Sequence, residues 1–121
     1  MRGRAQIALL FAALVCCACA PALPVPPYEP QEGASPVVVP FIPPPARVDV
    51  IGDPPPGLAH PVWVDGQWTW RGRRWAWEPG EWVELEPKKV YAKPIVVRRS
   101  DGQLVWFVGT FREDTRGSIS R

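Results

Sequence analysis

Tryptophan is concentrated in one short part of this 121-residue chain: six of its seven tryptophans lie between residues 63 and 82. The pattern W-x-x-G-x-W occurs at residues 63–68 and again, fourteen residues later, at residues 77–82. Tryptophan is large and costly to leave exposed to water, so this density predicts either a hydrophobic core or an aromatic binding surface. The chain is therefore limited to folds that bring these rings together.

Aromatic and polar residues alternate on both sides of the dipeptide Gly72-Arg73. A period of two residues is typical of a β-strand. Glycine at the first central position suits a two-residue type II′ turn, because this position requires a positive φ. Such a turn predicts a hairpin in which four tryptophans share one face, with Trp70 opposite Trp75 and Trp68 opposite Trp77.

A second hairpin is predicted around Asp101-Gly102, a dipeptide that favours a type I′ turn. This turn would place Val97 opposite Trp106 and Ile95 opposite Val108. Residues 91–96 and 106–111 resemble degenerate third and fourth copies of the aromatic unit. No segment beyond the first 20 residues has the apolar spacing of a helix. We therefore predict an all-β fold, a small antiparallel β-meander of four to six short strands.

Proline divides the chain, since fourteen of the seventeen prolines lie between residues 21 and 61. Proline fixes φ and lacks an N–H donor, so neither a helix nor a sheet propagates through such a segment. We predict a disordered, polyproline-II-rich stalk at residues 20–61, a tryptophan-rich β domain at residues 62–113 and a polar tail at residues 114–121. Two alternatives are a short edge strand within residues 37–42 and docking of the stalk on its own tryptophan surface.

Residues 1–19 have the features of an export signal: two arginines, an uncharged apolar run and then three cysteines. The run is too short to span a bilayer comfortably. Leu14 lies three residues before Cys17 and the local sequence resembles a lipobox, so we predict a lipid anchor at Cys17, with Cys19 as the alternative. The resemblance implies the outer membrane, because neither candidate is followed two residues later by aspartate. Ordinary cleavage would instead give a secreted or periplasmic protein.

The composition argues against several classes of function. Without Arg2 and Arg4 the chain carries 12 Lys and Arg against 12 Asp and Glu, so nucleic-acid binding is not expected. His60 is the only histidine and no cysteine follows Cys19, so neither a zinc site nor a histidine-dependent triad is available. The glutamates between residues 78 and 86 fit the solvent face of a strand better than a catalytic pair. We expect no enzyme activity, cofactor or metal.

The candidate binding face consists of the six clustered tryptophans, with a basic rim at the hairpin tip. The tryptophans are Trp63, Trp68, Trp70, Trp75, Trp77 and Trp82, and the rim is Arg71 and Arg74. Cross-strand aromatic pairs commonly form a core. The same rings, if exposed, would stack on sugar rings or on extended peptides.

The doubled motif, with its connector of arginines and glycine between aromatic residues, resembles the WXXGXW (YXWGXW) repeat family of bacteria over residues 62–85. The resemblance implies a small exported or lipid-anchored protein with a β fold, and it implies no active site. We therefore expect an envelope lipoprotein whose tryptophan module binds or spaces envelope polysaccharide, peptidoglycan or another envelope protein. The alternative is a purely structural spacer of the envelope or coat without a specific ligand.

Overall fold

The computed structural model describes residues 22–32 and 35–117. The signal, Cys17 and Cys19 lie outside these residues. The described residues form ten strands and one 3₁₀ turn, η1 (Thr115–Gly117), and contain no α-helix, so the all-β prediction is confirmed. The strands are β1 (Tyr28–Glu29), β2 (Val37–Val39), β3 (Pro61–Val64), β4 (Gln67–Arg71), β5 (Arg74–Glu78), β6 (Glu81–Glu84), β7 (Lys89–Ala92), β8 (Ile95–Arg98), β9 (Leu104–Phe107) and β10 (Thr110–Glu113). No helix in residues 22–32 or 35–117 has the length and apolar character needed to cross a membrane.

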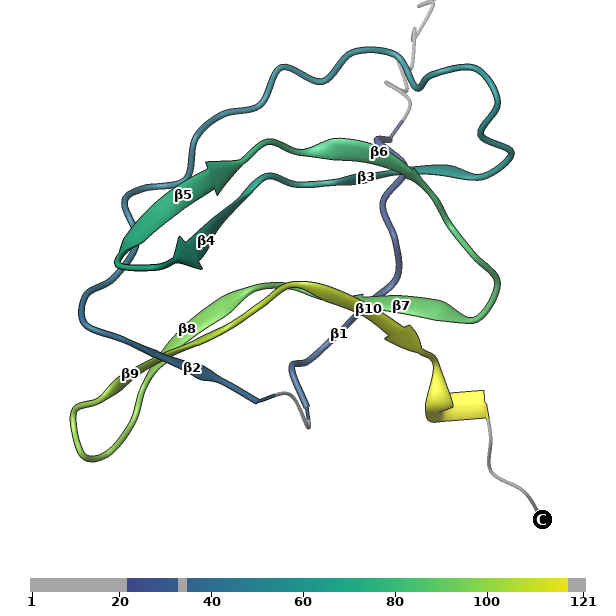
Figure 1. The fold of residues 1–121 in the computed structure, drawn as a ribbon. Helices are drawn as coiled ribbons and strands as arrows, with labels where there is room; N and C mark the ends of the chain where they lie inside the picture. Colours follow the sequence, from purple (N-terminus) through teal and green to yellow (C-terminus); the bar gives the residue numbers. More distant parts are fainter. Residues whose placement is uncertain (1–21, 33–34, 118–121) are drawn as a thin grey trace, which may run out of the picture.

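Eight of the strands build two long hairpins. In the first hairpin β3 pairs with β6 and β4 with β5, and in the second β7 pairs with β10 and β8 with β9. All pairs within each hairpin are antiparallel. Figure 1 shows the first hairpin, in teal and green, lying above the second, in green and yellow. Each of the four hairpin arms is interrupted at its middle and so counts as two strands. With β1 and β2 this gives ten strands in six extended segments of the chain.

The turn of the first hairpin has the predicted character. Gly72 has a φ of 65°, and Arg73 is not among the residues with positive φ, as a type II′ turn requires. The predicted pairing is confirmed, because Trp70 lies opposite Trp75 and Trp68 lies opposite Trp77.

The turn of the second hairpin differs from the prediction. The N–H of Gly102 donates to the carbonyl of Arg99 at 2.9 Å, and that of Arg99 to the carbonyl of Gln103 at 2.8 Å. Gly102 alone in this turn has a positive φ, of 86°. The loop therefore has three residues and not two. The predicted register was wrong by one residue, since Trp106 faces Val96 and not Val97.

The proline-rich segment lies along the two hairpins. β2 pairs with β9, and the short β1 runs parallel to β7. The N–H groups of Trp63 and Tyr91 each donate at 2.8 Å to a proline carbonyl, that of Pro24 and that of Pro27. Figure 1 shows the chain after β2 rising past the end of the hairpins and crossing above the first one. The part of the predicted stalk that is described is thus packed on the domain, because proline lacks a donor but keeps a carbonyl that an edge strand can use.

The core lies between the two hairpins. Val39, Trp75 and Trp106 form a buried cluster, against which other residues pack. The rings of Trp75 and Trp106 meet edge to face, with centroids 5.8 Å apart, and this contact joins the first hairpin to the second. The tryptophan face predicted from the sequence is therefore mainly an interior surface.

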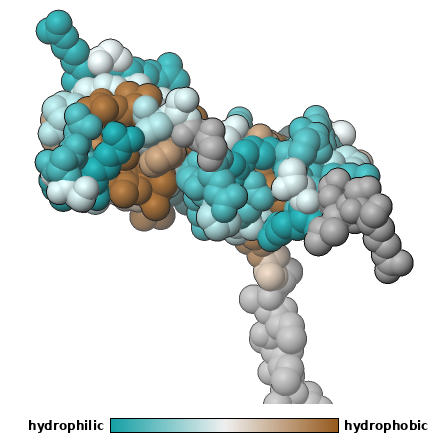
Figure 2. All heavy atoms as spheres, turned by 90° about the horizontal axis from the view of Figure 1, so that it is seen from below, coloured by the Kyte–Doolittle hydropathy of each residue, from teal (hydrophilic) through white to brown (hydrophobic). Residues whose placement is uncertain are grey.

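One outer face remains apolar. Side chains of β2 and β8 on this face that are more than a third exposed are Val38, Ile95 and Val97. Figure 2 shows an apolar patch in brown on the side of the molecule that holds these strands.

Candidate functional site

The six predicted tryptophans form three edge-to-face pairs across the first hairpin. The pairs are Trp63 with Trp82, Trp68 with Trp77 and Trp70 with Trp75, with ring centroids 5.6, 5.3 and 5.2 Å apart. Trp63 and Trp75 are buried, with 5% and 8% of their surface exposed, while the other four are half-buried. The structure thus brings together all six residues, and none lies fully in solvent.

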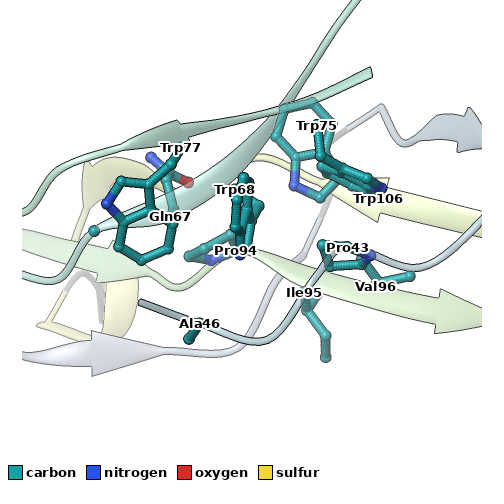
Figure 3. A pocket seen from close by; sticks show the side chains of 11 residues that line it. Pro43, Ala46, Gln67, Trp68, Trp75, Trp77, Pro94, Ile95, Val96 and Trp106 are labelled. Atoms are coloured by element: carbon teal, nitrogen blue, oxygen red, sulfur yellow. The ribbon is translucent and has the colours of Figure 1, made fainter. Parts of the chain in front are cut away.

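A cavity of about 270 Å³ lies between the two hairpins, beside three of these rings, and Trp63, Trp70 and Trp82 do not line it. Figure 3 shows Trp77 and Gln67 at one end, Trp75 and Trp106 at the other, and Trp68 and Pro94 between them. The remaining lining residues are Pro43, Ala46, Gly66, Ile95 and Val96. The walls are largely apolar and aromatic, as in sites that take small apolar groups.

Two residues of this lining carry buried polar atoms without a hydrogen-bond partner in the described part of the chain. They are the indole nitrogen of Trp106, a donor, and the Oε1 of Gln67, an acceptor. Buried polar groups are normally paired, because leaving them unpaired costs free energy. Both atoms have almost no exposed area, so they lie behind the cavity wall and not on its surface.

The tryptophans also hold the proline-rich segment through their indole N–H groups. We call residues 41–52 the strap. Each of three indoles donates to a strap carbonyl: Trp75 to Phe41 at 3.1 Å, Trp68 to Pro45 at 3.2 Å and Trp82 to Gly52 at 3.0 Å. The strap therefore supplies acceptors that proline-rich backbone leaves free.

A strap residue that sequence reasoning missed lies at the middle of the first hairpin. The carboxylate of Asp49 accepts the backbone N–H of Gly66 at 3.1 Å and that of Gly80 at 3.3 Å. Both glycines are the G of a W-x-x-G-x-W unit, and their regular position is the only sequence signal that could have indicated a shared partner. Arg47, also missed, places its guanidinium 5.1 Å from the ring centroid of Trp68.

The predicted rim lies away from the cavity. Arg71 and Arg74 are exposed and face each other at the hairpin tip, and neither lines the cavity. Arg71 forms an ion pair with Glu78. The Arg71 guanidinium therefore lies beside Glu78, at the end of β5 away from the hairpin tip.

Titratable groups away from the cavity include two with shifted pKa values, Glu84 and Tyr91. The backbone N–H of His60 bonds to the Glu84 carboxylate and holds the pKa of that group below its usual value. Burial raises the pKa of Tyr91 to about 12. Within residues 22–32 and 35–117 no group of three His, Cys, Asp or Glu side chains is placed to hold a metal ion.

Comparison of the chain with protein families, curated proteins and solved structures finds no match.

Proposed function

We propose that this protein is a non-catalytic lipoprotein of the cell envelope, anchored through Cys17, whose tryptophan module binds a small apolar or aromatic group of an envelope component. The anchor rests on the sequence of residues 1–19, where all three cysteines follow an export-like run. The binding role rests on the cavity between the hairpins.

The observation that carries the binding role is the aromatic and apolar wall of the cavity, to which Trp68, Trp75, Trp77 and Trp106 contribute. Flat indole surfaces stack on the apolar faces of sugar rings without requiring net charge. Peptidoglycan fragments and envelope polysaccharide are therefore the proposed ligands.

A structural spacer without a specific ligand is the second candidate. It is favoured by the edge-to-face pairing of the rings and by the three indole N–H groups that are already bound to the strap. Rings used in this way stabilise a small domain.

Titration of the full-length protein in detergent with peptidoglycan fragments and with outer-membrane polysaccharide separates the two candidates. Binding in the cavity should change the tryptophan fluorescence in a saturable way. Val96→Phe, which adds volume to a half-buried residue of the lining, should abolish this change. The matched control is Val48→Phe, since Val48 is 95% exposed and lies outside the lining. An unchanged spectrum, or equal responses from both variants, would favour the spacer.

A further inference from the structure

The first hairpin opens at its middle although its register continues. β3 with β6 and β4 with β5 follow one uninterrupted register, yet residues 65–66 and 79–80 belong to no strand. The backbone N–H groups of Gly66 and Gly80 meet the Asp49 carboxylate there and not a strand partner. Two N–H groups directed at one carboxylate form a small anion site of the kind that backbone nests provide.

Glycine is required at both positions by the crowding around this opening. A Cβ on Gly66 would lie 2.8 Å from the Asp49 Oδ2 and 2.9 Å from the carbonyl oxygen of Glu78. A Cβ on Gly80 would lie 2.9 Å from the same Asp49 oxygen. Real Cβ contacts are not this short, so the glycines leave the space that the carboxylate occupies.

The second hairpin has the same opening but a different filling. Pro94 stands where the first hairpin has Gly66, and proline offers no N–H. There the Gln31 side chain donates its amide to the carbonyls of Lys93, Val108 and Ala92, at 2.8, 2.9 and 3.3 Å. Each opening thus holds a side chain that complements its backbone groups. In the first hairpin a carboxylate accepts from N–H groups, and in the second an amide donates to carbonyls.

The strap is held through its backbone, through the Asp49 carboxylate and through two side-chain contacts, those of Phe41 with Trp70 and of Arg47 with Trp68. Its carbonyls meet three indole N–H groups, and its one carboxylate meets the two glycines. Val48 and Val50, on either side of Asp49, are 95% and 97% exposed. The hydrogen bonds to the strap therefore recognise its backbone and the Asp49 carboxylate, whereas the side chains of Val48 and Val50 are not recognised.

We propose that the paired W-x-x-G-x-W units form a binding site for an aspartate on an extended peptide, and that the strap is the displaceable occupant of this site. A peptide is favoured over a polysaccharide because the indoles donate to peptide carbonyls on both sides of the carboxylate. The carboxylate site adjoins the cavity, since Gly66, Trp68 and Trp75 belong to both, but Asp49 and Gly80 do not line the cavity. Displacing the strap would also remove Pro43 and Ala46 from the cavity wall.

Chemical rescue tests the carboxylate site. Asp49→Ala in the full-length protein leaves room for a small anion, so sodium acetate or formate should raise its melting temperature above that in sodium chloride of equal ionic strength. The wild type and Asp53→Ala, an exposed strap-side control, should show no such difference. In ¹⁵N spectra acetate should shift the amides of Gly66 and Gly80. Equal melting in the two salts, with unmoved glycine amides, would overturn the site.

A peptide in trans tests the choice of ligand. A synthetic peptide of residues 41–52 should bind Asp49→Ala at least about tenfold more tightly than the same peptide with alanine for Asp49, the ratio expected from charge-assisted hydrogen bonds. If Asp49→Ala folds only in acetate, that result supports the site, and Asp49→Asn then takes its place in the peptide titration. Equal binding of the two peptides would overturn the proposal, as would shifts of the glycine amides by an acidic polysaccharide but not by the peptide.

Discussion

Gly80 lies against the indole ring of Trp63, so close that a Cβ on this glycine would be 2.5 Å from the Cζ2 atom of the ring. The same relationship joins Gly66 to Trp77 and Gly109 to Tyr91. In each case the glycine of one aromatic unit makes room for the first aromatic ring of the unit paired with it. The spacing W-x-x-G therefore describes a packing contact across the hairpin, and it extends to the degenerate units of the second hairpin.

Gly80→Ala should destabilise the protein by about 1–3 kcal/mol, because the added methyl group overlaps the Trp63 ring and lies 2.8 Å from the carbonyl oxygen of Val64. The matched control is Gly52→Ala, since a Cβ there meets nothing within 4 Å and Gly52 has no positive φ. Urea denaturation of both variants measures the effect. Equal midpoints would show that the glycine does not determine this contact.

Trp75→Ala should cost about 3–5 kcal/mol, because it removes a buried ring that joins the two hairpins. A small domain of ordinary stability retains little after such a loss. Val48→Ala, at a position that is 95% exposed, should change the free energy of unfolding by less than about 0.5 kcal/mol. Circular dichroism melting curves of the two variants test this difference, and a Trp75→Ala protein that melts like the wild type would contradict the assignment of the core.

Alkaline pH should destabilise the fold through Tyr91. Its pKa is raised by burial from 10.0 to about 12, so the unfolded chain releases this proton first as the pH rises. Below pH 10 the titration of Tyr91 adds no pH dependence to stability. Between pH 10 and about 12 the free energy of unfolding should fall by up to about 1.4 kcal/mol per pH unit. Tyr91→Phe should flatten this part of the pH profile of the urea midpoint. Tyr28, whose pKa is also raised by burial, adds a contribution that remains in the variant. Parallel profiles for the variant and the wild type would rule out this role.

Cys17→Ser should abolish lipid attachment, because the sulfur of the Cys17 thiol is the atom that accepts the diacylglycerol. Mass spectrometry of the membrane fraction should find the modified residue in the wild type and in Cys19→Ser, and should not find it in Cys17→Ser. An unmodified chain beginning at Pro21 in the soluble periplasmic fraction would refute the anchor. Modification that is lost only in Cys19→Ser would move the anchor to the alternative cysteine.

The features predicted correctly from the sequence are those set by short-range chemistry. Alternation of aromatic and polar residues produces strands, and the φ preference of Gly72 sets the first turn. Trp68 and Trp70 therefore share a face with Trp77 and Trp75, as the residue order alone predicts. The second turn shows the limit of such reasoning. Asp101-Gly102 is compatible with a two-residue or a three-residue loop, and the choice between them moved the partner of Trp106 by one residue.

The position of the strap and the burial of the tryptophans were decided only by the tertiary structure. Asp49 is 17 residues from Gly66 and 31 from Gly80 along the chain, and it meets their backbone N–H groups, which every residue except proline possesses. A contact of this kind leaves no pattern in the residue types around Asp49. Likewise, whether a tryptophan face becomes core or surface depends on what covers it, here Trp106 from the second hairpin and the carbonyls of the strap. Local spacing determines the direction of a side chain, whereas burial depends on which distant parts of the chain pack against it.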